Sequence, residues 1–205
     1  MEDPRVLRSR ARIVEAARHC FAEQGYRDTS VADVAARAGV TKRTIYNLYQ
    51  DKEALFRTAL EASISIAETF IADLVAEIEN VAEASPDLPR LAVRLAQDVL
   101  IGQVTDLRRL VATEAAEFPD LAQRYRTGAP EAVLAALATA FGALTERGQL
   151  AAEGPELAAE HFAFLVMGAD LDRRMLGAPP VSAARVRRKA LAGAQTFLRA
   201  YGAQP

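Results

Sequence analysis

A short polar run between residues 42 and 47 carries side chains that can read the edges of DNA bases. Lys and Arg donate hydrogen bonds to guanine O6 and N7, Thr contacts the thymine methyl group, and Asn pairs with adenine. The candidate base contacts are Lys42, Arg43, Thr44 and Asn47. An ordinary solvated helix face is the alternative, so the interpretation depends on the elements that hold this run.

The residues around the polar run have the pattern of a helix-turn-helix. Short helices are predicted at Val31–Ala38 and Lys42–Tyr49, with Gly39 in the turn between them. Gly39 can adopt the positive φ that such a turn requires. Ser30, with Asp33 three residues further on, predicts a capped start for the first of these helices. The second helix of this motif enters the major groove with its N-terminal end, which favours base reading by the polar run.

The rest of the chain is also predicted to be helical, because Ala and Leu are abundant and Pro and Gly cluster between periodic stretches. Further helices are expected at 5–24, 51–80, 90–101, 104–116, 120–126, 130–147, 156–176 and 182–201, with a break at 83–89. We therefore predict an all-α fold. A three-helix DNA-binding domain is expected at residues 1–50, and a helical bundle for ligand binding and dimerisation at residues 51–205.

The net charge of −2 conceals an uneven distribution along the chain. Residues 1–60 have eleven Lys and Arg against eight Asp and Glu, whereas residues 61–205 have fourteen against nineteen. A basic end on an acidic body fits a protein that contacts a polyanion at one end. We expect neither a membrane span nor a secretory signal, because no long uncharged apolar run is present, and therefore a cytoplasmic location.

Residue constellations that carry enzyme chemistry are missing from the sequence. Neither His19 nor His161 follows a Glu by three residues, as di-metal carboxylate bundles require. The sequence has no Gly-rich phosphate loop, and Cys20 is poorly placed on a helix to act with His19. We expect no catalytic residue, no metal site and no cofactor; an all-α enzyme is the alternative.

Between Phe21 and Phe56 the sequence resembles the TetR family of bacterial repressors. The shared positions are Phe21, Gly25-Tyr26, Thr29-Ser30-Val31, Asp33-Val34-Ala35, Ala38-Gly39-Val40, Ile45-Tyr46, Tyr49, Lys52-Glu53 and Leu55-Phe56. The resemblance implies phosphate contacts from a further set of residues, Thr29, Ser30, Thr41, Tyr46 and Lys52. The sequence departs from the family at Arg43, where glycine is common, and at Leu48, where a polar phosphate contact is common. Residues 114–119, 176–177 and 197–201 resemble a branch linked to efflux regulation.

The last two predicted helices are the candidate dimer interface, because the first of them is apolar on most faces. In the family, the corresponding helices pair with those of a second copy. The expected interface residues are Leu165, Val186, Ala190, Gly193, Phe197 and Tyr201. Alternatively, both helices belong to the core of one protomer.

An effector pocket is expected in the C-terminal domain. Its candidate lining residues are Phe70, Leu74, Gln103, Leu107, Leu110, Glu114, Phe141 and Phe162. Few of them are polar, which favours an apolar or aromatic ligand, although the same residues can be plain core. The function expected is a ligand-responsive repressor that binds palindromic DNA as a homodimer. A ligand-independent architectural DNA-binding protein is the alternative to this regulator.

Overall fold

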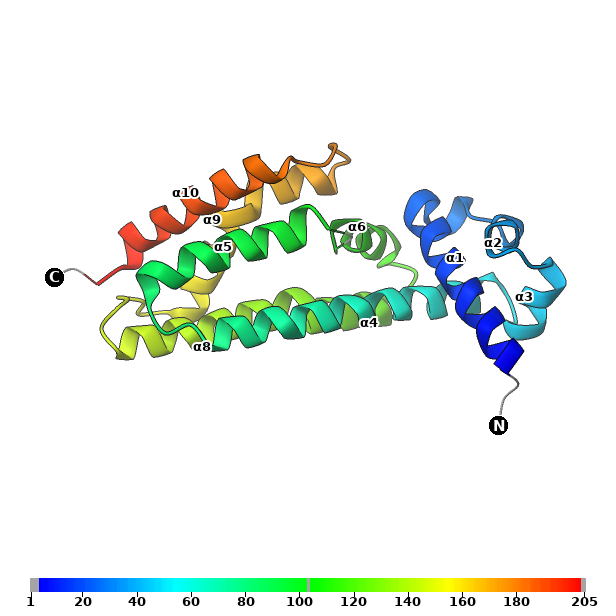
Figure 1. Ribbon diagram of the computed structural model, residues 1–205, viewed down its shortest axis with the longest axis horizontal. Coiled ribbons are helices and arrows are strands. Elements are labelled where there is room, and N and C mark those ends of the chain that lie inside the picture. Colours follow the sequence, from blue (N-terminus) through cyan, green and yellow to red (C-terminus); the bar gives the residue numbers. More distant parts are fainter. Residues whose placement is uncertain (1–3, 103, 204–205) are drawn as a thin grey trace. The chain divides into compact units, whose positions relative to one another are not determined.

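The computed structural model describes residues 4–102 and 104–203, which are almost entirely helical (Figure 1). The helices are α1 (Pro4–Asp28), α2 (Val31–Ala38), α3 (Lys42–Leu48), α4 (Lys52–Glu79), α5 (Ala84–Leu100), α6 (Val104–Glu114), α7 (Pro119–Arg126), η1 (Thr127–Glu131), α8 (Ala132–Glu146), α9 (Pro155–Met175) and α10 (Ala183–Tyr201). Within the described ranges, the β-structure is limited to an isolated bridge between Leu150 and Gly202. The prediction of an all-α fold is confirmed.

Two predicted breaks are helical in the structure. The segment 83–89 forms the start of α5, where Pro86 lies in the first turn and loses no helical hydrogen bond by lacking an amide hydrogen. The Asp87 carboxylate accepts the backbone N–H groups of Ala82 and Glu83 at 3.0 Å and so fixes the entry to this helix. Residues 127–131, which include Pro130, form a π-helical turn that joins α7 to α8. Proline was therefore a poor guide to helix ends at both places.

Contacts between residues divide the chain into two compact units. The first contains Met1–Ala67 with Arg109–Tyr125, and the second contains Glu68–Arg108 with Arg126–Pro205. This division differs from the expected boundary at residue 50, because a segment distant in sequence joins the N-terminal helices.

Four aromatic rings explain why that segment belongs to the first unit. Phe118 packs against Phe56 and Tyr26, with ring centroids 4.7 and 5.2 Å apart, and Phe21 packs edge-on against Phe56 at 4.9 Å. Such pairs stabilise a core beyond the area they bury. The start of α7 is thereby fixed to α1 and α4 within this unit.

In the second unit, α9 packs between α8 and α10. Phe162 of α9 contacts Phe141 of α8 at a centroid distance of 5.5 Å and Phe197 of α10 at 5.2 Å. All three rings are fully buried. A Cβ on Gly193 of α10 would lie 2.6 Å from the backbone oxygen of Leu165, so glycine is needed for this close approach.

The helical run Pro119–Glu146 is long and apolar enough, by length and composition, to cross a membrane. Within α8, Val133, Leu137, Phe141 and Leu144 are buried against the rest of the unit. A core helix of this kind passes the same test, so the run is weak evidence for a membrane span.

Candidate nucleic-acid interface

The turn between α2 and α3 has the backbone geometry that the sequence predicts. Gly39 adopts a left-handed conformation with φ 63° and ψ 41°, and the N–H of Val40 bonds back to the carbonyl of Ala35 at 3.0 Å. Thr41 then caps α3 by accepting a hydrogen bond from the N–H of Thr44 at 3.1 Å. A left-handed residue ends α2 and redirects the chain, and α3 starts immediately after it.

Arg12 of α1 holds this turn from the inside, a role that sequence reasoning missed. Its guanidinium donates to the carbonyl oxygen of Ala38 at 2.5 Å (Nη2) and 3.2 Å (Nε), and to that of Gly39 at 3.0 Å. Carbonyl groups at a helix C-terminus lack helical partners and attract cations. Arg12 therefore fixes the end of α2 and the turn that aims α3.

The side chain of Ile45 anchors α3 by its buried face. Ile45 and Val34 are both buried, and their small apolar contact lets α2 and α3 cross closely. Tyr49 ends α3 and is buried too, which raises the pKa of its hydroxyl. Leu48, whose orientation the sequence left open, is half-buried.

The opposite face of α3 carries the predicted base contacts. Lys42, Arg43 and Asn47 are exposed, whereas Thr44 is half-buried and its hydroxyl lies 2.9 Å from that of Thr41. The structure thus places the long cationic and amide side chains together on one solvent-facing surface. Hydrogen-bond donors of this kind can reach base edges in a major groove.

The start of α2 does not offer the phosphate contacts expected there. Thr29 is 1% exposed, and its hydroxyl donates to the carbonyl oxygens of Cys20 and Gly25. Ser30 is exposed, but its hydroxyl and its backbone N–H both donate to the Asp33 carboxylate. The hydrogen bonds from Ser30 lower the pKa of Asp33, so the carboxylate keeps a negative charge that repels phosphate. We correct the expectation for both residues: they close α1 and cap α2.

The other predicted phosphate contacts are better placed. Tyr46 is 54% exposed, and Thr41 is exposed at the start of α3. Lys52 is half-buried, lies over the Tyr26 ring and donates one hydrogen bond to the Arg27 carbonyl at 3.0 Å. An ammonium group has three hydrogens, so this bond is compatible with a phosphate contact.

Several predicted pocket residues have other roles in the structure. Phe141 and Phe162 fill the core of the second unit together with Phe197. Glu114 belongs to the first unit, where its carboxylate accepts the backbone N–H of Tyr26. These three assignments to a pocket are corrected accordingly.

The remaining pocket residues stay predictions. Leu74 is fully buried, Leu107 and Leu110 are half-buried, and Phe70 is 59% exposed. Gln103 lies outside the described residues.

The predicted dimer residues lie mostly inside one chain. Val186, Ala190, Gly193 and Phe197 are buried by α5 and α9 of the same protomer, and Tyr201 stacks on Phe197. They pack in the core because α10 lies so close to α9, and we correct their assignment to an interface. Leu165, which is 43% exposed, keeps its predicted place.

Comparisons with known proteins agree with this geometry. The family model described as "Bacterial regulatory proteins, tetR family" matches residues 13–59, and the model described as "AefR-like transcriptional repressor, C-terminal domain" matches residues 86–203. The first covers the helix-turn-helix, and the second covers more than half of the chain.

Individual relatives give the same result. The repressor AcnR of Corynebacterium efficiens is 39% identical over 31% of this chain and 34% of its own length. The regulator AcrR of Shigella flexneri is 33% identical over 52% of this chain and 46% of its own length. The matched part thus spans between a third and a half of these two curated relatives.

A crystal structure extends the likeness to the whole chain. A TetR-family transcriptional regulator from Mesorhizobium loti is 29% identical, with a TM-score of 0.80 over 98% of this chain and all of that one. The relatives are transcriptional regulators and not enzymes, as expected from the sequence. From its helix-turn-helix to its C-terminal bundle, the chain belongs to the TetR family of bacterial transcriptional regulators.

Proposed function

We propose that this protein is a ligand-responsive transcriptional repressor that binds a palindromic operator as a homodimer in the cytoplasm. The observation that carries the proposal is the exposed polar face of α3, with Lys42, Arg43 and Asn47, held in place by the left-handed turn at Gly39 and by Arg12. The matching family model for the C-terminal part describes a repressor, which supports repression over activation.

Base reading is proposed for the four residues that the sequence singled out, and phosphate binding for a smaller set than expected. Lys42 and Arg43 at the start of α3 reach the groove first, with Thr44 and Asn47 following. Thr41, Tyr46 and Lys52 contact the backbone on either side. Phosphate contacts of this kind position the protein, whereas the base contacts specify the sequence.

The homodimer is proposed to form through the outer face of α9. Leu157, Phe164 and Leu165 are 55%, 71% and 43% exposed on this helix. Apolar side chains exposed together on one helix mark an interaction site. Two copies joined there present two α3 helices, which a palindrome one helical turn apart requires.

A small, largely apolar effector is proposed to release the DNA. The fold supports this, because SmeT of Stenotrophomonas maltophilia, 20% identical with a TM-score of 0.66, has been solved as a complex with triclosan. An effector that binds only one conformation weakens DNA binding, and DNA weakens effector binding by the same factor.

Selection of bound sequences from random duplex DNA tests the proposal. The purified protein is expected to enrich a palindrome with half-sites about ten base pairs apart, and a compound screen on that duplex is expected to find molecules that release it. Enrichment of no sequence over random DNA would contradict the proposal. Enrichment without any releasing compound would favour the ligand-independent alternative.

A further inference from the structure

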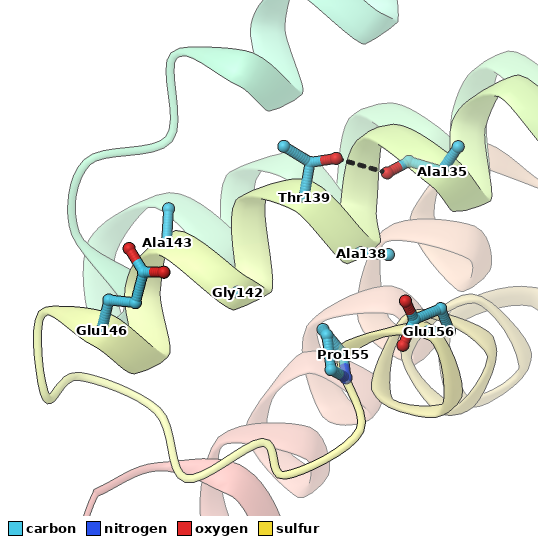
Figure 2. Close-up of a pocket in the computed structure, with 8 residues that line it drawn as sticks. All are labelled: Ala135, Ala138, Thr139, Gly142, Ala143, Glu146, Pro155 and Glu156. Atoms are coloured by element: carbon cyan, nitrogen blue, oxygen red, sulfur yellow. Dashed lines mark hydrogen bonds between the residues drawn. The ribbon is translucent and has the colours of Figure 1, made fainter.

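The outer face of α8 forms a shallow groove with an acidic rim (Figure 2). Its volume is roughly 600 Å³. The groove is lined by Ala135, Ala138, Thr139, Gly142, Ala143, Glu146, Pro155 and Glu156. Because α8 contains no Lys or Arg, the exposed carboxylates of Glu146 and Glu156 set the charge of the groove. The small residues leave room for a helix to approach closely.

The groove borders the exposed apolar face of α9. Glu156 is the second residue of α9, and Leu157 follows it directly. Phe164 lies seven residues after Leu157, two helical turns further along the same side. The acidic groove and the apolar face are therefore parts of one continuous surface.

On the other side of α9, the outer face of α10 is basic. Arg188, Ala192, Gln195 and Arg199 are exposed and follow one another at steps of four, three and four residues, so they form one stripe. α10 contains five Arg and Lys residues and no Asp or Glu. Lys189 and Arg185 bind the buried Asp170 carboxylate, and the stripe lies beside them. The surface thus changes from acidic on α8, through apolar on α9, to basic on α10.

Such an order is complementary to itself. A two-fold axis that runs along α9 brings the apolar faces of two copies together and places α8 of each copy opposite α10 of the other. We propose that the acidic groove of α8 receives the basic stripe of α10 from a second copy of this chain, with Glu146 and Glu156 facing Arg188 and Arg199. This inference rests on the proposed homodimer and names the contacts that set its register.

Charge reversal tests the pairing. One variant carries E146K and E156K, so that both outer helices are basic; the other carries R188E and R199E, so that both are acidic. Like charges then meet in each homodimer, and dimerisation is expected to weaken at least tenfold by sedimentation. In an equimolar mixture, opposite charges meet again at both contacts, so a heterodimer is expected to form with close to wild-type affinity. High salt should reduce the preference, because exposed charges are screened.

Controls separate the pairing from folding and from the dimer itself. R187E changes an exposed cation outside the stripe and is expected to leave the dimer unchanged. The corresponding Gln variants, E146Q/E156Q and R188Q/R199Q, remove charge without repulsion and should weaken the dimer less than reversal does; thermal unfolding checks that each variant folds.

Each remaining outcome rejects one of the claims. Reversed homodimers as tight as wild type would overturn the pairing and leave the homodimer standing. Weakened homodimers that the mixture does not rescue would do the same, because the groove would then have another role. A monomeric wild-type protein would instead overturn the homodimer that this inference rests on.

Discussion

The Glu114 carboxylate accepts a hydrogen bond from the backbone N–H of Tyr26 at 3.2 Å. Glu114 is the last residue of α6 and is only 7% exposed, and its oxygen lies 3.8 Å from where a Cβ on Gly25 would stand. Gly25 has φ 79° and kinks α1 at this point. The end of α6 is therefore bonded to the kink of α1, two residues short of the segment that leads into α2.

Replacing Glu114 by Ala is expected to destabilise the N-terminal unit by about 1–3 kcal/mol, because a backbone N–H loses its acceptor. Glu114→Gln should cost less, since its amide oxygen can still accept the bond. Urea unfolding followed by circular dichroism measures both. If the two variants unfold at the wild-type midpoint, the bond contributes nothing to stability.

A second prediction concerns Arg12, which touches the turn and not the proposed DNA face. Arg12→Ala should weaken binding to all duplexes alike, roughly tenfold, the effect of losing about one hydrogen bond to a charged group. Its salt dependence should stay that of wild type, because no phosphate contact is lost. Arg12→Lys is the matched control for charge, and is expected to restore only part of the affinity since it lacks the guanidinium fork. A fall of about one in the salt slope for Arg12→Ala would mean that Arg12 binds phosphate directly.

A third prediction concerns Asp170, which joins α9 to α10. Burial opposes ionisation of this carboxylate, but hydrogen bonds from Lys189 and Arg173 and the charge of Arg185 hold its pKa below the usual value. A lowered folded-state pKa stabilises the protein fully above the unfolded pKa of about 3.9. That contribution is lost as the pH falls through the folded-state pKa.

Asp170→Asn should therefore destabilise the protein near neutral pH by on the order of 2 kcal/mol, because three charged hydrogen bonds are weakened. The difference from wild type should shrink in acid, where Asp170 of the wild type becomes protonated. Thermal unfolding between pH 7 and pH 3 measures this difference. A gap between the two proteins that stays constant over the whole range would refute the charged link.

The helix-turn-helix was predictable because its determinants are local. Gly39, Ser30, Asp33 and Thr41 act within a few residues of their own positions, and the structure places each at the predicted turn or cap. Local backbone geometry and capping can be derived from spacing alone. The exposed face of α3 follows from the same spacing once Ile45 is taken as its buried anchor.

Long-range contacts could not be derived in this way. Nothing near Glu114 in the sequence indicates that it meets Tyr26, and an apolar stripe such as that of Phe197 suits a protomer core as well as a dimer interface. Periodicity shows that a face is buried but not by what. For Thr29 the reason is different, because its buried hydroxyl closes α1 in a kink that the sequence did not predict.

The account's central claim is that α3 reads bases through Arg43. Affinities of wild type and Arg43→Ala for every single-base-pair variant of the selected half-site test it most directly. Arg43→Ala should lose preference at one base pair per half-site, by about 1–3 kcal/mol if the guanidinium binds guanine at two points, with the ranking elsewhere unchanged. An Arg43→Ala protein that ranks all half-site variants as wild type does would contradict the claim.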